Sequence, residues 1–358
     1  MRGVLVLLLA VAAGCTSWRD YVHNGFKVGP NFCPPQAAVA PCWIDAANAN
    51  VRSEPTDAAA WWQTFNDPAL NALVCDAYRQ NLTLRVAGLR ILEARAQRAI
   101  VAGELFPQTQ QLAGAYTRNG NSLNAANTSP NRFFDDWQTG AGFAWELDFW
   151  GQFRRALESA DAHLSSTIYN YDDVLVILIS DVATNYMTLR TAEQRILYAR
   201  KNVEIQKGSL RLADVKFTNG ATTRLDVTQA QSNLSQTQAT IPPLVALRRQ
   251  AANQICILLG MPPHDLEAIL GQRDIPAASP TVVVGIPADL LRRRPDIRRA
   301  ECDAAAQCAQ IGVATAALYP HFSISGTIFY DAQNFKDLFE PNSFGGTVGP
   351  SFRWDVLN

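Results

Sequence analysis

The sequence predicts an α+β membrane protein in which β-hairpins and long antiparallel helices form a duplicated unit. Leu105-Phe106-Pro107 recurs as Leu318-Tyr319-Pro320, and residues 140–147 are echoed by residues 349–356. A heptad pattern of apolar residues runs from residue 164 to residue 217. A repeat of this length indicates a duplicated supersecondary unit, and a seam of this length indicates a helix too long for a compact domain.

Residues 1–14 have the organisation of a bacterial signal peptide. Arg2 is basic, the apolar residues 4–13 are too few to span a bilayer, and small residues precede Cys15. This ending resembles a lipobox, in which the cysteine becomes the first residue of the mature chain and carries the lipid. We therefore expect Cys15 to be the lipid attachment site, the alternative being an ordinary signal peptide with a chance cysteine.

Composition argues against several function classes. The formal net charge is -1 and the chain has no basic block, so no nucleic-acid partner is expected. A mean hydropathy of -0.06 argues against a bundle of membrane-spanning helices. The histidines and cysteines show no metal-ligand spacing, so we expect neither metal nor cofactor. Cys33 and Cys42 either close a small disulfide loop or remain free buried thiols.

The first part of the chain divides into an arm and a helix pair. Residues 15–66 are rich in proline, which predicts an extended arm. The first repeat then covers residues 67–260, and its helices begin at Asp67, a plausible N-cap, followed by Pro68 in the first turn. A second helix is expected over residues 82–105, because Phe106-Pro107 would end it.

Residues 108–148 predict a β-hairpin with a long polar loop. Leu112, Gly114 and Tyr116 alternate with small or polar residues, and Phe143 and Trp145 do the same further on. Strands of outer-membrane barrels have this loose alternation. An exposed hairpin of a soluble protein is the alternative interpretation.

Residues 151–259 predict a tall helical hairpin. Its first limb, residues 151–217, would be about 100 Å long as one helix, and small seam residues towards Phe217 predict tighter packing there. Gly220 would end this limb in a left-handed conformation. Thr222 or Thr223 would cap the return limb, which has its own seam and a kink at Pro242-Pro243. A solitary two-stranded coiled coil without a lumen is the alternative.

The remaining residues predict a collar and a second repeat. Turn residues gather in residues 261–285, which we interpret as an equatorial collar segment. The second repeat covers residues 286–358, with a helix followed by a strand pair over residues 322–356. No GxSxG, HExxH or glycine-rich phosphate loop is present, so we do not expect an enzyme.

Several motifs of the chain resemble those of a known family. Together they are similar to the outer membrane factors of tripartite (RND-type) efflux systems, in the TolC/OprM-like, NodT-like lipoprotein branch. The resemblance covers essentially the whole chain. It rests on Cys15 and on five motifs, at residues 27–32, 61–70 and 145–151, at Gly220 with residues 225–227, and at residues 291–297.

The resemblance implies a TolC-like outer membrane efflux fold and a function. It implies a homotrimer in the outer membrane, in which each chain gives two hairpins to a shared twelve-stranded barrel and its helices form a periplasmic tunnel. The partners would be a periplasmic adaptor protein and an inner-membrane RND pump, and the duct would passively export small solutes or drugs. By position, Gly220 makes the tip turn and Thr223, Arg224 and Leu225 are candidate adaptor contacts, although helix capping alone also explains Gly220 and Thr223.

The chain departs from the family pattern at its end. The family's second tall hairpin, where the gating residues are expected, would begin after Asn358. The sequence therefore predicts a C-terminally truncated member whose second repeat is incomplete. The alternative function is a truncated, non-conducting envelope lipoprotein with a structural or scaffold role.

Overall fold

The computed structural model describes residues 17–35, 47–48, 51–52, 58–122, 124, 132–271, 273–278, 282–283 and 293–355. The predicted signal peptide, Cys15, Cys42 and the start of the second repeat lie outside these residues. The chain forms two compact units that cut across the sequence repeat. The sheet unit comprises Met1–Gln36, Ile91–Ile168 and Arg298–Asn358, and the collar unit comprises Ala37–Arg90 and Tyr169–Ile297.

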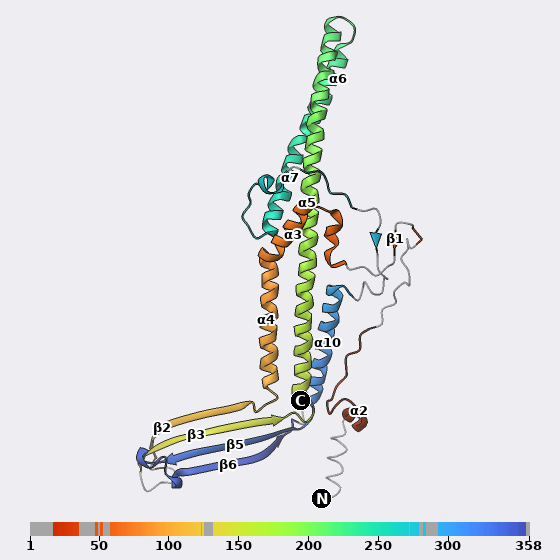
Figure 1. Cartoon of the computed structure of the whole chain (residues 1–358). Helices are drawn as coiled ribbons and strands as arrows, with labels where there is room; N and C mark the ends of the chain where they lie inside the picture. The colour runs from red at the N-terminus through yellow and green to blue at the C-terminus, as the bar shows by residue number, and fades with distance from the viewer. Residues whose placement is uncertain are drawn as a thin grey trace. The chain divides into compact units, whose positions relative to one another are not determined.

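The sheet unit contains four antiparallel strands in the order β2-β3-β5-β6 (Figure 1). The first hairpin is β2 (Thr109–Gly120) and β3 (Phe133–Leu147), as predicted for residues 108–148. The second is β5 (His321–Ala332) and β6 (Phe344–Arg353), which two short 3-10 turns connect, Phe335–Asp337 and Pro341–Ser343. The hairpins of the two repeats join through β3 and β5, so the duplicated passages build one continuous sheet.

A duplicated hydrogen bond confirms the repeat. The indole Nε1 of Trp145 donates to the carbonyl of Leu105 at 3.3 Å, and the indole Nε1 of Trp354 donates to the carbonyl of Leu318 at 3.1 Å. The sequence pairs these same residues between the two passages. In both copies the bond ties the end of the second strand to the turn before the first strand.

The long helix is continuous. Helix α5 (Gln152–Thr218) has 67 residues, which corresponds to about 100 Å. The return limb consists of α6 (Arg224–Ala239) and α7 (Ile241–Leu258), separated at Thr240. This break is the predicted kink, because Pro242 and Pro243 have no amide hydrogen for the preceding turn. Figure 1 shows α6 running back beside the last part of α5.

Both predicted seams are visible in the burial pattern. Along α5, Leu178, Val182, Leu189, Ala192 and Val203 are buried. On the return limb every seam position is buried or half-buried. Burial falls towards the tip, where the Phe217 side chain is 43% exposed. The predicted closer approach of a neighbouring helix towards Phe217 stays a prediction.

The core of the collar unit combines several elements. Helix α3 (Pro68–Gln80), the first turns of α4 (Leu82–Gly103), α5, α7 and the collar segment contribute to it. Leu70, Tyr186, Ile255 and Leu266 are among its most buried side chains. Because more than two helices share this core, the alternative of a solitary two-stranded coiled coil is excluded. Asp67 caps α3 as predicted and accepts hydrogen bonds from the amides of Ala69 and Leu70.

The arm is less extended than predicted. It contains helix α2 (Trp18–His23) and a 3-10 segment, Ala58–Phe65. Helix α2 forms because the Ser17 side chain accepts a hydrogen bond from the Arg19 amide and Tyr21 finds a buried site. In the collar segment α8 (Glu267–Leu270) is helical, and β1 (Val51–Arg52) pairs in parallel with β4 (Val282–Val283). Cys33 is a free thiol, but it is exposed rather than buried.

Candidate functional site

The two faces of the four-stranded sheet differ in chemistry. Directly paired residues share a face, and neighbouring rows alternate between faces. One row across all four strands is Leu112, Ala141, Ile328 and Gly346, and the adjacent row on the other face is Gln111, Gly142, Thr327 and Thr347. The register therefore separates an apolar face from a polar face.

The apolar face continues along the strands. It includes Leu112, Tyr116, Trp137, Ala141, Phe143, Trp145, Phe322, Ile324, Ile328, Tyr330, Phe344, Val348, Pro350 and Phe352. The predicted sets Leu112, Gly114, Tyr116 and Phe143, Trp145 fall on this one face. Phe143 lies across Gly326, its direct partner, where an added Cβ would come within 2.6 Å of the ring. An aromatic ring over a strand glycine restores packing that the glycine lacks.

Aromatic rings gather at both ends of the apolar face. At the loop end, Trp137 contacts Tyr116 and Phe335, with ring centroids 4.4 and 5.1 Å apart. At the helix end, Phe322 contacts Phe149 at 5.7 Å and Phe352 at 6.5 Å. Two aromatic girdles on either side of an apolar band are typical of strands that cross an outer membrane.

The length of the band agrees with this arrangement. Phe322 and Tyr330 mark the two ends on β5, and eight strand steps span about 27 Å along the strand. A strand tilt of about 40° shortens this to about 20 Å across the bilayer, close to the apolar band of about 25 Å in such barrels. The Arg118–Asp135 ion pair, 2.9 Å, lies two rows beyond the Tyr116–Trp137 pair on the same face, where charged groups would reach lipid headgroups or water.

Hydroxyl groups pair across strands on the polar face. The hydroxyls of Ser323 and Ser351 are 2.8 Å apart, and those of Thr327 and Thr347 are 3.0 Å apart. Such cross-strand pairs stabilise a sheet and leave a hydrophilic surface. In the described part of the chain β2 and β6 each pair on one side only, so the sheet has two open edges.

The tip of the tall hairpin is built by helix-capping chemistry. Gly220 has φ +71°, its amide donates to the carbonyl of Phe217 at 3.0 Å, and the Ala221 amide donates to the carbonyl of Lys216 at 2.8 Å. These two bonds form a Schellman motif, which needs the left-handed residue. The predicted role of Gly220 in the turn is therefore confirmed.

The return limb begins with a dense cap around one carboxylate. Thr223 is the N-cap, and Asp226 Oδ2 accepts from the Thr222 hydroxyl at 2.5 Å, the Thr223 hydroxyl at 2.7 Å and the Thr223 amide at 3.0 Å. These bonds, led by the Thr222 hydroxyl, lower the pKa of Asp226 to about 2. The cap holds the turn rigid while Arg224 and Leu225 project outward, with Leu225 74% exposed.

A buried arginine organises the collar unit, and sequence reasoning missed it. Arg190 on α5 is fully buried, and its guanidinium donates to the carbonyls of Leu270 at 2.9 Å and Gly271 at 2.7 Å. It also pairs with Glu193 at 2.9 Å and lies 5.0 Å above the ring of Tyr186. Its position beside the seam gave no signal, because a flanking charge usually faces solvent.

The same network reaches the start of α3. The Tyr186 hydroxyl donates to the Asp67 carboxylate at 2.6 Å. Burial alone would raise the pKa of Asp67, but the hydrogen bonds from Tyr186 and from the amides of Ala69 and Leu70 outweigh it, so the pKa lies below its usual value. Asp67 therefore acts as more than a helix cap, because it also links α3 to α5.

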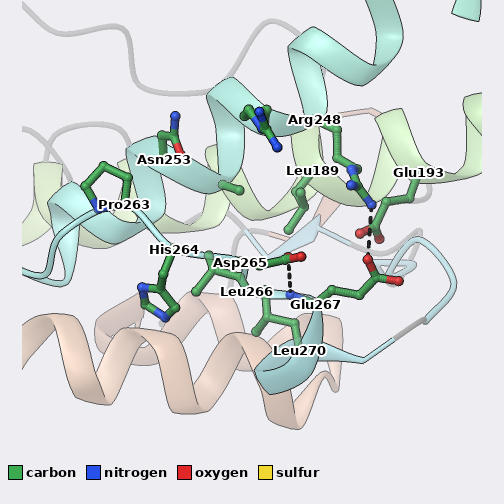
Figure 2. A pocket seen from close by; sticks show the side chains of 12 residues that line it. Leu189, Glu193, Arg248, Asn253, Pro263, His264, Asp265, Leu266, Glu267 and Leu270 are labelled. Atoms are coloured by element: carbon green, nitrogen blue, oxygen red, sulfur yellow. Dashed lines mark hydrogen bonds and ion pairs between the residues drawn. The ribbon is translucent and has the colours of Figure 1, made fainter.

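A pocket of about 350 Å³ lies between α5, α7 and the collar segment (Figure 2). Its charged groups are mostly engaged with one another: Arg248 pairs with Glu267 at 3.4 Å, and Asp265 accepts from the Glu267 amide at 3.0 Å. His264 lies at the edge of the pocket, beside the buried thiol of Cys256 at 3.8 Å. Within the described residues no group of three potential metal ligands is found.

The arm motif at residues 27–32 is clamped in the sheet unit. Arg155 donates to the carbonyls of Val28 at 3.0 Å and Gly29 at 2.9 Å, and Lys27 forms an ion pair with Glu158. Gly29 has φ +83°, and an added Cβ would lie 2.4 Å from the Cα of Gly312 on α10 (Pro295–Ala316). Only glycine allows this approach of arm and helix.

The structure describes four of the five predicted site residues. Gly220, Thr223, Arg224 and Leu225 lie together at the hairpin tip, whereas Cys15 lies outside the described residues. Among the helices that the structure describes, none combines the length and the hydrophobicity that a bilayer crossing demands.

Comparisons with known proteins agree with this architecture. The family model for outer membrane efflux proteins matches residues 73–261. Nodulation protein T of Rhizobium leguminosarum bv. trifolii is 35% identical over 315 residues, which cover 87% of this chain and 66% of that protein. The pyoverdine export outer membrane protein OpmQ of Pseudomonas aeruginosa is 30% identical, over 80% of this chain and 61% of its own length.

Solved structures show the same fold. The outer-membrane channel OprN has a TM-score of 0.85 and 35% sequence identity, with 91% of this chain and 73% of that chain covered. The chain thus spans about two thirds or less of the two curated relatives and about three quarters of the solved channel.

Proposed function

The chain belongs to the outer membrane efflux protein family, and on that premise we propose that it is the outer-membrane channel component of a tripartite efflux pump. Its strands contribute to a barrel in the outer membrane and its helices to a duct in the periplasm. Small solutes or drugs pass through the duct passively. The observation that carries this proposal is the sheet with one apolar face between two aromatic girdles and one hydroxyl-rich face.

The open sheet edges support assembly of several copies. A lipid-exposed strand edge has no water to satisfy its amides and carbonyls, so β2 and β6 need partners. Two copies would give eight strands, and a barrel of about eight strands is filled by its own side chains. Three copies would give twelve strands and a lumen lined by the polar face. A homotrimer, the number that the family resemblance implies, is therefore the proposed assembly.

The hairpin tip is the proposed contact with a periplasmic adaptor protein. Arg224 and Leu225 are exposed on a turn that the Schellman motif and the Asp226 cap hold in one conformation. A preformed turn loses little conformational entropy on binding. Gly220 and Thr223 then shape the contact, whereas Arg224 and Leu225 make it. The adaptor would connect the duct to an inner-membrane RND pump.

The proposal also covers the cellular location of the protein and its lack of catalysis. We place the protein in the outer membrane, with its helices in the periplasm and a lipid on Cys15 as anchor. The duct has no catalysis of its own and binds neither cofactor nor nucleic acid. In such a system the pump chooses the substrate, and the relatives illustrate the range: one exports pyoverdine and another is a solvent efflux protein.

Channel recording of the purified full chain tests the proposal. We expect steps of steady conductance in planar bilayers, and a detergent-resistant trimer on gels that dissociates on heating. The matched control is Gly326→Arg, which places a charge on the apolar face beside Phe143 and should abolish both signals. A folded protein that gives neither trimer nor conductance would instead support the scaffold function.

A further inference from the structure

Large apolar side chains of the arm are exposed together. Trp18 and Val22 lie four residues apart on α2, so they share one face of the helix. Their side chains are 72% and 43% exposed, and Phe26, in the turn that follows, is 52% exposed. A single exposed apolar side chain needs no explanation, but a group of this kind marks a contact surface.

This part of the arm is held in a fixed conformation. The Tyr21 hydroxyl donates to the carbonyl of Phe149 at 2.6 Å, and the Arg154 guanidinium donates to the carbonyls of Gly25 at 2.8 Å and Phe26 at 2.7 Å. Phe26 has φ +60°, a left-handed conformation that is rare for a bulky residue. The structure thus maintains local strain at a residue whose ring remains exposed, which indicates a role outside the core.

Aromatic contacts connect this surface to the apolar face of the sheet. The buried ring of Tyr21 lies 5.6 Å from the rings of both Trp18 and Phe26, and 6.4 Å from that of Phe149. Phe149 lies 5.7 Å from Phe322, and Phe322 lies 6.5 Å from Phe352. Phe322 and Phe352 belong to the girdle at the helix end of the sheet. All of these residues are in the sheet unit. The exposed arm residues are therefore continuous with the girdle.

We propose that α2 and the following turn are an interfacial membrane anchor, in which Trp18, Val22 and Phe26 insert among the phospholipids of the periplasmic leaflet of the outer membrane. This inference rests on the proposed function, because it needs the sheet to cross that membrane. Phospholipid is the occupant that the continuity with the lipid-facing girdle favours. Tryptophan is enriched at this depth, where its ring is apolar and its N–H meets water. The exposed Arg19 can reach lipid phosphates from the same helix.

The anchor would complement the acyl chains proposed on Cys15, three residues before Trp18. Stable attachment of a peripheral segment usually takes two signals, such as a lipid and a second membrane-binding element. The arm would then be fixed to the bilayer by side chains as well as by lipid.

Tryptophan quenching by brominated phospholipids tests the anchor in the full chain. The protein is reconstituted in phosphatidylethanolamine and phosphatidylglycerol vesicles, with and without bromine near the headgroup end of the acyl chains. The chain has eight tryptophans, so the emission of Trp18 is obtained as the difference between wild type and Trp18→Phe. We expect the brominated lipid to quench this difference spectrum at least twofold. Trp61→Phe is the matched control, and the emission that it removes should be insensitive to bromine.

Two further variants make each outcome decisive. Phe26→Trp should add emission that the brominated lipid quenches, which gives a second reading independent of Trp18. Trp137→Phe reports on the sheet itself: if Trp137 emission is quenched and neither position 18 nor position 26 is, the anchor is refuted while the proposed function stands. If Trp137 emission is also insensitive, the proposed function fails. A blue-shifted but unquenched Trp18 would show that a second copy covers it, which also refutes the anchor.

Discussion

Replacing Arg190 by methionine should release the collar segment from α5. Methionine fills a similar volume but donates no hydrogen bond, so the buried carbonyl of Leu270 loses its partner. The carbonyl of Gly271, a residue that is itself exposed, loses its partner too and can be solvated in part. Each buried acceptor left unsatisfied costs about 1–3 kcal/mol. Glu193 is 23% exposed and can be solvated in part, so its contribution is smaller. We expect the local stability of the collar segment to fall by about 3 kcal/mol.

Hydrogen exchange measures this loss where it occurs. The amides of Leu270 and Gly271 donate within α8, to Leu266 and Glu267, both at 2.9 Å. A loss of about 3 kcal/mol should speed their exchange on the order of 100-fold, because about 1.4 kcal/mol corresponds to a factor of ten. The exchange of amides in the sheet unit should not change.

Two control variants separate the loss of the carbonyl contacts from the loss of a positive charge on α5 and from the loss of the ion pair with Glu193. Arg195→Met changes an exposed arginine of the same helix and should alter exchange less than about twofold. Glu193→Gln keeps both carbonyl contacts and should give only a small increase. The reasoning would be refuted if Arg190→Met left exchange at Leu270 and Gly271 within about threefold of wild type, or if Glu193→Gln had the same effect as Arg190→Met.

Three further predictions concern the tip and the arm. Gly220→Ala, at φ +71°, should destabilise the tip by about 1 kcal/mol and speed exchange of the Ala221 amide. Gly208→Ala inside α5 meets no steric obstacle and should stabilise its helix. Equal changes in stability in the two variants would contradict the role of Gly220. The pKa of Asp226 is lowered to about 2, so the stability it gives the tip is present above the ordinary pKa and lost as pH falls through about 2. Amide exchange between pH 4 and pH 2 should show this loss in wild type and not in Asp226→Asn. Gly29→Ala would bring its Cβ within 2.4 Å of Gly312 Cα and displace the arm, so trypsin should cleave after Lys27 at least tenfold faster. The control Gly25→Ala, whose Cβ meets no atom within 4 Å, should change the cleavage rate much less. Similar cleavage rates in the two variants would show that the contact between Gly29 and Gly312 does not hold the arm.

Periodic features could be predicted from the sequence, because their signals are local. The seam residues at intervals of three and four predicted α5 almost to its ends, Gly220 predicted the turn, and Pro242-Pro243 predicted the break at Thr240. The alternation around Leu112 and Phe143 predicted both strands of the first hairpin. In each case the physical cause lies within a few residues of the effect.

The features that were missed depend on distant partners. Arg190 is buried because carbonyls about 80 residues later receive its hydrogen bonds. Helix α2 has only six residues and stands in a proline-rich arm, and it is stabilised by Tyr21 contacting Phe149, 128 residues away. The β3–β5 register, which unites the two repeats, joins strands separated by about 180 residues. Contacts between residues so far apart in the sequence cannot be predicted from a local pattern.

The strand order of the sheet has a consequence for symmetry. Edge strand β2 begins the first hairpin and edge strand β6 ends the second, while β3 and β5 join the two hairpins inside the chain. If β6 of one copy pairs with β2 of the next, each chain boundary repeats the arrangement of the internal junction, the last strand of one hairpin beside the first strand of another. A ring of three chains would then consist of six nearly equivalent hairpins. Its wall would have pseudo-sixfold rotational symmetry, with each hairpin turning the sheet by about 60°.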